Sequence, residues 1–117
     1  MKTVYLDNNA TTQVAPEVLE VMLPYFHELY GNPSSMHAFG GQVAKKLREA
    51  REQAAALIGA SPDEIIFTSC GTESDNAAIR SALATYPDRR HIVTSRVEHP
   101  AVKSLCANLA SQGYRVT

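Results

Sequence analysis

From residue 65 to the end of the chain, apolar strand-like runs alternate with helix-like segments. Strand patterns at 65–69 and 91–95 precede helical patterns at about 73–85 and 100–112, and a further strand pattern starts at Tyr114. Such alternation is typical of parallel sheets whose right-handed crossovers place helices on the sheet faces. The sequence therefore predicts an α/β fold with about three parallel strands. Because that is a small sheet for this class, we expect the chain to be the front part of a larger protein.

Helical patterns precede this alternation. Pro16 suits the first turn of a helix that is kinked or ended near Pro24, and whose apolar residues are expected to face inward: Val18, Leu19, Met22, Leu23 and Phe26. A second amphipathic pattern runs from about residue 41 to 58, and Gly59 is a natural helix stop. An N-terminal helical segment therefore precedes the βαβ units.

The segments outside these helices are short. Residues 4–6 form a short strand candidate, and residues 31–35 are dense in turn-forming residue types. We expect a loop at residues 31–35, and Gly113 is expected to stop the helix that precedes Tyr114.

Composition narrows the class of partner. The 117 residues are 44% apolar, and the formal net charge is −1 with acidic and basic residues interspersed. This balance argues against a nucleic-acid partner and an anionic membrane surface, and favours a small molecule or a protein. We expect no signal peptide, no membrane span and a cytoplasmic location. Cys70 and Cys106 lack metal-ligand spacing, so we expect two reduced thiols and no metal site.

The passage from strand to helix at residues 65–76 predicts an anion site. A helix start offers unpaired backbone N–H groups and the positive end of the helix dipole, and here the hydroxyls of Ser69 and Thr72 flank it. The alternative is that these polar residues only cap the helix. Gly71 is followed by Thr72 and Glu73 rather than by the lysine of a P-loop, so a phosphate is favoured over a nucleoside triphosphate.

His99 lies beyond the carboxyl end of the strand pattern at 91–95, directly before Pro100. Ligands bind at this edge of open α/β sheets, and the turn at Gly71 and Thr72 shares it. An imidazole there could stack on a flat ligand or move a proton. The alternative is an N-cap or loop histidine without a ligand.

Four motifs together resemble a known family. Residues 5–12, 31–37, 67–76 and 97–102 match, in order and spacing, the pyridoxal-phosphate-dependent cysteine desulfurases of the class V aminotransferase group, fold type I. The last two motifs are most similar to the nitrogen-fixation branch. The resemblance covers nearly the whole chain. It implies an N-terminal arm over residues 1–14, followed over residues 15–117 by the first part of the large domain that binds pyridoxal phosphate.

The resemblance also implies roles for single residues. Gly71 and Thr72 would bind the cofactor phosphate through a backbone amide and a hydroxyl, and His99 would stack on the pyridine ring and take part in proton transfer. The two N-terminal motifs would line the substrate entrance through Asn8, Ala10, Thr11, Asn32 and His37.

The activity that the resemblance implies is the conversion of L-cysteine to L-alanine. A cytoplasmic homodimer would pass persulfide sulfur to an iron–sulfur scaffold protein, in a role related to nitrogenase. The family's cofactor-binding lysine and its catalytic cysteine lie beyond Thr117. No lysine here is placed to substitute, the full set being Lys2, Lys45, Lys46 and Lys103. The chain alone is therefore predicted to be inactive.

Neither cysteine is expected to act as the catalytic one. Cys70 would be buried at the end of a strand, and Cys106 would pack inside the last helix. Two other interpretations stay open at this point. The chain could be an inactive fragment or a binding module, or it could belong to another class V enzyme such as a selenocysteine lyase.

Overall fold

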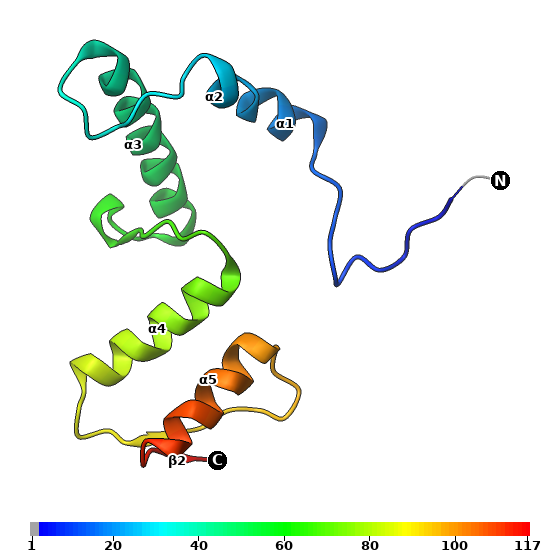
Figure 1. Cartoon of the computed structure of the whole chain (residues 1–117), viewed down its shortest axis with the longest axis vertical. Coiled ribbons are helices and arrows are strands. Elements are labelled where there is room, and N and C mark those ends of the chain that lie inside the picture. The colour runs from blue at the N-terminus through cyan, green and yellow to red at the C-terminus, as the bar shows by residue number, and fades with distance from the viewer. Residues whose placement is uncertain (1–2) are drawn as a thin grey trace. The chain divides into compact units, whose positions relative to one another are not determined.

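A computed structural model describes residues 3–117, and the prediction for Lys2 lies outside the described residues. The chain divides into two compact units, of which the first ends at Ile65 and the second is Ile66–Thr117 (Figure 1). Each unit is described separately below.

Helices make up the regular structure of the first unit: α1 (Pro16–Met22), α2 (Pro24–His27), α3 (Ala38–Ile58) and the short 3-10 helix η1 (Pro62–Glu64). Pro24 separates α1 from α2, as predicted, because a proline removes a helical hydrogen bond and fits only the first turn. The predicted stop of α3 at Gly59 is confirmed, since this residue has φ +68°, which glycine adopts without steric cost. The Arg51 side chain on α3 donates to the Ile65 carbonyl beyond η1.

Helix α3 begins three residues before the predicted start. His37 is its N-cap, and the His37 ring Nδ1 accepts a hydrogen bond from the Gly40 backbone N–H at 3.2 Å. Histidine is not a common N-cap, so the sequence did not indicate this start. The predicted loop at residues 31–35 is confirmed.

Two predictions for the first unit are wrong. The apolar side chains of α1, of α2 and of the residue between them are exposed rather than inward, and the exposed fraction of Phe26 is 73%. These side chains are Val18, Leu19, Met22, Leu23 and Phe26. Residues 4–6 form no strand, and there the Tyr5 hydroxyl donates to the Asp7 carbonyl. The physical reason is the same in both cases, because an apolar face and a strand each need a packing partner, and the described residues of this unit supply none for them.

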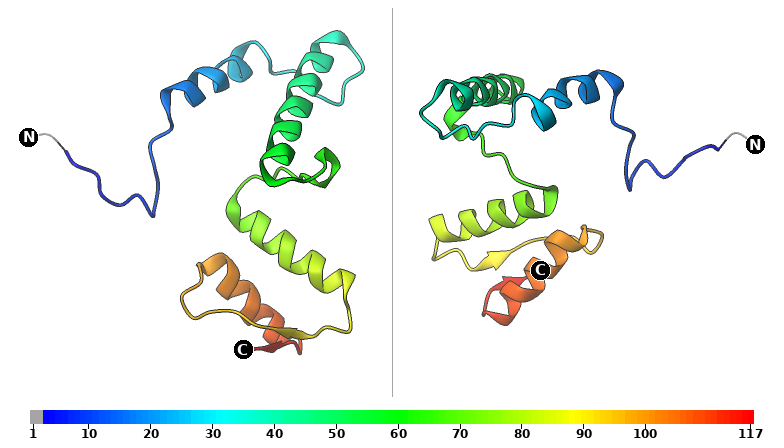
Figure 2. Two further views of the ribbon diagram at one scale, coloured as in Figure 1. Left: turned by 180° about the vertical axis from the view of Figure 1, so that it is seen from behind. Right: turned by 45° about the horizontal axis from the view of Figure 1, so that its top comes forward.

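The second unit contains α4 (Gly71–Thr85), β1 (His91–Ile92), α5 (Pro100–Ser111) and β2 (Arg115–Val116). In both views of Figure 2, α4 and α5 lie side by side. Helix α5 packs against both α4 and β2. Strands β1 and β2 are parallel and pair His91 with Arg115 and Ile92 with Val116. The buried side chains of this unit all come from α5: Ala101, Leu105, Cys106 and Leu109. Helix α5 is therefore the centre of its core.

The sheet has two strands among the described residues, not three. Residues 65–68 form no strand, so the predicted strand at 65–69 is wrong, and Ile66 is 82% exposed. Strand hydrogen bonds join separate segments, and among the described residues the sheet joins β1 to β2 alone. The parallel pairing of the other two predicted strands, the helices around them and the turn at Gly113 with φ +86° are confirmed.

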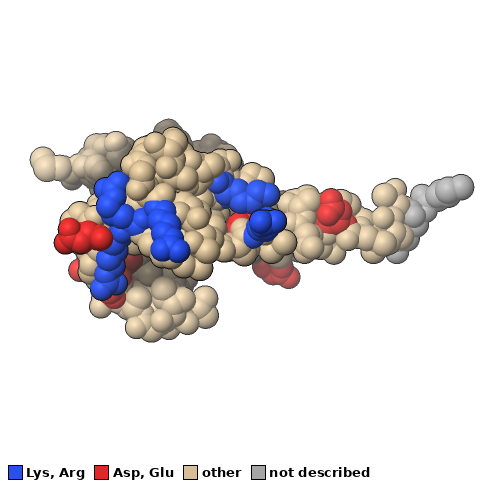
Figure 3. Space-filling model, turned by 90° about the horizontal axis from the view of Figure 1, so that it is seen from below, with Lys and Arg blue, Asp and Glu red and all other residues tan. Residues whose placement is uncertain are grey.

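The surface carries mixed charge. On the face shown in Figure 3, acidic side chains lie among the lysine and arginine side chains. Within residues 3–117, no helix has both the length and the hydropathy that crossing a membrane would require.

Candidate functional site

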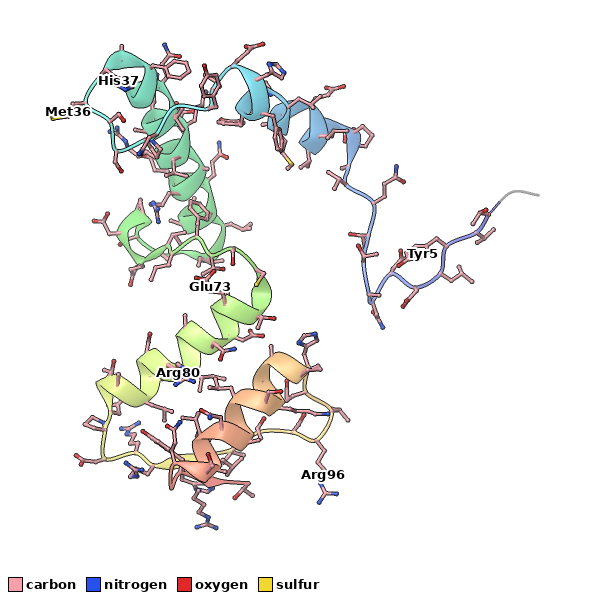
Figure 4. All side chains as sticks on the ribbon, viewed as in Figure 1. Tyr5, Met36, His37, Glu73, Arg80 and Arg96 are labelled. Carbon is pink, nitrogen blue, oxygen red and sulfur yellow. The ribbon has the colours of Figure 1, made fainter. Side chains whose placement is uncertain are left out.

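A cavity of about 500 Å³ lies between α4 and α5 in the second unit. Helix α4 contributes residues at every fourth position, which share one helix face, and α5 contributes its N-cap and one face. The lining residues are Thr72, Asn76, Arg80, His99, Pro100, Ala101, Ser104, Leu105 and Asn108. In Figure 4 the labelled Arg80 lies midway along α4. The structure thus brings Thr72 and His99, both predicted from sequence, to one cavity.

The polar lining residues Asn76, Arg80, Ser104 and Asn108 were missed. The sequence did contain a signal for Asn76 and Arg80. They follow Thr72 at i+4 and i+8 on a predicted helix, which places all three on one helix face. Within the described residues no ion pair is found for Arg80, so it is the charged group of the lining that is free to meet an anion.

The start of α4 offers one backbone donor and one hydroxyl of the kind that the anion prediction requires. Gly71 and Thr72 are its first two residues. Within residues 3–117 the Gly71 backbone N–H has no acceptor, whereas the Thr72 backbone N–H donates to the Cys70 sulfur. The Thr72 hydroxyl also lacks a partner there and lines the cavity. A Cβ added at Gly71 would meet nothing within 4 Å, so the space beside this residue is open, although Gly71 itself does not line the cavity.

Ser69 does not flank the cavity as predicted. Its hydroxyl lies 2.6 Å from the Glu73 carboxylate and its backbone N–H donates to the same oxygen at 2.7 Å. The Ser69 hydroxyl, followed by this N–H, lowers the pKa of Glu73. Figure 4 shows Glu73 at the start of α4, where a carboxylate is favoured by the helix dipole. The Ser69 hydroxyl is therefore engaged by the Glu73 carboxylate and caps no helix N–H, and Thr72 supplies the cavity hydroxyl.

Cys70 is exposed, so the prediction that it is buried is wrong. That prediction rested on a strand at 65–69, which the structure does not contain. The Glu73 backbone N–H, then the Ser69 hydroxyl, lower the pKa of the Cys70 thiol. Cys106 is buried in α5, and its predicted packing role is confirmed.

Alkylation should distinguish the two thiols. Cys70 is expected to react with iodoacetamide at lower pH than a cysteine in an unfolded peptide, because its lowered pKa gives more thiolate. Cys106 should stay unmodified until the chain unfolds. Peptide mapping by mass spectrometry over a pH series measures both rates, with Cys70→Ser as the control for background labelling. A Cys70 rate that rises only at the pH of the unfolded peptide would contradict the prediction.

His99 is the N-cap of α5. Its Nδ1 accepts a hydrogen bond from the Ala101 backbone N–H at 3.2 Å, so in the neutral ring the proton is on Nε2. The alternative interpretation of His99 as an N-cap is therefore confirmed, and the ring lines the cavity as well. The imidazole has a defined tautomer and an exposed donor nitrogen.

The candidate entrance residues all lie in the first unit. The Ala10 and Thr11 backbone N–H groups donate to the Asp7 carbonyl in an exposed turn that contains Asn8. The Asn32 Oδ1 accepts from the Ser34 N–H at 2.8 Å. Figure 4 shows His37, the cap of α3, next to Met36. The entrance role of these five residues stays a prediction: Asn8, Ala10, Thr11, Asn32 and His37. In the part of the chain described, no His, Cys, Asp and Glu side chains gather in a group that could hold a metal.

Comparison with known proteins matches the Aminotransferase class-V family model over residues 4–117. A cysteine desulfurase of Trichormus azollae is 63% identical over this whole chain, and the cysteine desulfurase NifS of Azotobacter vinelandii is 58% identical over 99% of it. The match covers 29% of each of these relatives. The chain thus spans less than a third of their length.

Two solved structures match the fold of this chain. A NifS-like protein superposes with a TM-score of 0.90 at 43% identity, covering 97% of this chain and 32% of that one. A structure of SspA in complex with cysteine gives the same TM-score at 38% identity, covering 98% of this chain and 33% of the other.

Proposed function

Because this chain belongs to the class V aminotransferase family, we propose that it forms the part of a cysteine desulfurase that holds pyridoxal phosphate. Its fold is the N-terminal part of a fold-type I pyridoxal-phosphate-dependent transferase. The observation that carries the proposal is the single cavity lined by both Thr72 and His99. The relatives' activity supports L-cysteine as the substrate.

The residues present fit the cofactor. A phosphate suits the Gly71 N–H, which has no acceptor among the described residues, and the unpartnered Thr72 hydroxyl, with the dipole of α4 behind them. A flat ring suits the exposed imidazole of His99, whose Nε2 proton is directed away from the capped Nδ1. The cavity of about 500 Å³ is large enough for a small molecule and is open to solvent on one side. No lysine is among its lining residues.

Bound there, pyridoxal phosphate supplies an electron sink for bond rearrangement at the substrate Cα and Cβ. In the proposed reaction L-cysteine and a protein thiol give L-alanine and a persulfide, so the Cβ–S bond breaks and an S–S bond forms. Thr72 anchors the phosphate end, while His99 orients the ring and holds a proton at Nε2. The complete enzyme is proposed to be a cytoplasmic homodimer that passes sulfur to an iron–sulfur scaffold protein, in the nitrogen-fixation branch.

A segment exchange tests this function. Residues 1–117 of this chain would replace the matching segment of Azotobacter vinelandii NifS, and the hybrid should release alanine and sulfide in equal amounts from L-cysteine and a reductant. A hybrid that binds the cofactor but leaves cysteine unchanged would contradict the desulfurase proposal. Turnover of selenocysteine alone would favour a selenocysteine lyase.

The alternative of an inactive fragment or binding module needs a separate test. The protein would be isolated from its source cell, and its intact mass measured with and without borohydride, which traps lysine-bound pyridoxal phosphate. A mass well above 12.7 kDa with a cofactor increment supports a working enzyme, whereas a mass of 12.7 kDa without one supports the alternative.

Thr72→Val should weaken pyridoxal phosphate binding by about 1 kcal/mol, or about fivefold, because valine keeps the shape but removes the hydroxyl. Titration of the chain, followed by the ³¹P resonance of the cofactor, measures the affinity. Thr85→Val is the matched control, since the Thr85 hydroxyl bonds only the Ser81 carbonyl at the other end of α4. Equal affinities of wild type and Thr72→Val would remove Thr72 from the site.

A further inference from the structure

Asn76 contacts the first turns of two helices at once. It lies on the second turn of α4, and its side-chain Nδ2 is 2.9 Å from the Thr72 carbonyl oxygen and 3.5 Å from the Ala101 carbonyl oxygen on α5. Both partners are carbonyl oxygens, which only accept hydrogen bonds, so the NH₂ end of the amide must face them. The two protons of one amide group thus serve two helices.

The contact with Ala101 leads to His99. The backbone N–H of Ala101 donates to the His99 Nδ1 at 3.2 Å, and Ala101 is buried between the helices. A path therefore runs from the first turn of α4 through Asn76 to the Ala101 carbonyl, along the Ala101 backbone to its N–H, and on to the imidazole. The residues at its two ends, Thr72 and His99, line the same cavity.

We propose that Asn76 is a positioning residue that holds the His99 ring in a fixed place relative to Thr72. The link to pyridoxal phosphate rests on the proposed function, whereas the link between Asn76 and His99 stands on the hydrogen bonds alone. Asparagine suits this role because its short side chain carries two donors in one plane. Leucine has nearly the same shape without a donor, and aspartate at neutral pH would place oxygen against both carbonyls.

The first test needs no substitution. In the ¹⁵N-labelled wild-type chain, the Asn76 side-chain amide protons should show nuclear Overhauser effects to residues at the starts of both α4 and α5. The His99 ring nitrogens should report the Nε2–H tautomer. Absence of the contacts to α5 would overturn the proposal, whether or not the chain binds a cofactor.

The second test is Asn76→Leu. The His99 ring resonances should shift toward the tautomer mixture of an unfolded peptide, and the affinity for pyridoxal phosphate should fall about fivefold. Thr85→Val is again the matched control, because it removes one side-chain bond to an i−4 carbonyl on the same helix without reaching α5. Asn76→Gln keeps the amide donors and should restore part of the wild-type tautomer. A purely structural role of Asn76 would not predict this rescue.

The outcomes separate the two proposals. Unchanged His99 resonances in folded Asn76→Leu would overturn the positioning role. Shifted resonances in a chain whose wild type does not bind pyridoxal phosphate would support the positioning role and count against the proposed function. If circular dichroism shows that Asn76→Leu does not fold, the wild-type contacts and the Asn76→Gln resonances decide.

Discussion

Leu105→Ala is expected to destabilise the second unit by about 2–5 kcal/mol, as is usual when a buried leucine is truncated. Leu105 on α5 is 4% exposed, belongs to the core of the second unit, and also lines the cavity. The buried side chains of this unit are few and all come from α5, so the remaining core can compensate little. Because small domains are only marginally stable, we expect the variant to lose the packing of α4 on α5 and with it cofactor binding.

Urea unfolding followed by circular dichroism measures this loss, and ³¹P titration follows binding in the same samples. Leu57→Ala on α3 is the matched control, because it makes the same chemical change at a side chain that is 86% exposed. The control should change the free energy of unfolding by less than about 0.5 kcal/mol. Equal effects of the two variants would mean that α5 is not the core of its unit.

Gly40→Ala is expected to destabilise the first unit by about 1–3 kcal/mol, through overpacking. Gly40 is buried in the first turn of α3. A Cβ there would collide with the Asn32 carbonyl oxygen and would come within 2.9 Å of the Ser35 Cβ. Backbone atoms cannot move aside as a flexible side chain can, so the loop at residues 31–35 must shift. We expect the hydrogen bond from the Gly40 N–H to the His37 ring to weaken as well.

The adjacent glycine supplies the control for this second prediction. A Cβ at Gly41 would meet nothing within 4 Å, so Gly41→Ala should stabilise α3 by about 0.5–1 kcal/mol, because alanine has the higher helix propensity. The two variants change the same residue type at neighbouring positions with opposite expected signs. Thermal unfolding measures both, and a shift of the same sign in both would contradict the packing of the loop against α3.

The helices could be predicted from the sequence because their determinants are local. Gly59 ends α3 through its own backbone conformation, and Pro24 interrupts its helix by lacking an N–H. The start of α3 could not be predicted, since its cap is a histidine ring. The strand at 65–69 was wrongly predicted for a different reason. A strand exists only with a neighbour, and apolar β-prone residues indicate the tendency without supplying that neighbour.

For the site, the sequence by itself determined the helix start at Gly71, the Thr72 hydroxyl, the histidine before Pro100 and the family to which they belong. These depend on residue type and on order along the chain. Only the tertiary structure decided that the Ser69 hydroxyl binds the Glu73 carboxylate, that Cys70 is exposed, and that Asn76 joins two helices. These facts depend on atomic distances that the order of residues does not give, and for Asn76 and Ala101 the packing of α4 against α5 sets the distance.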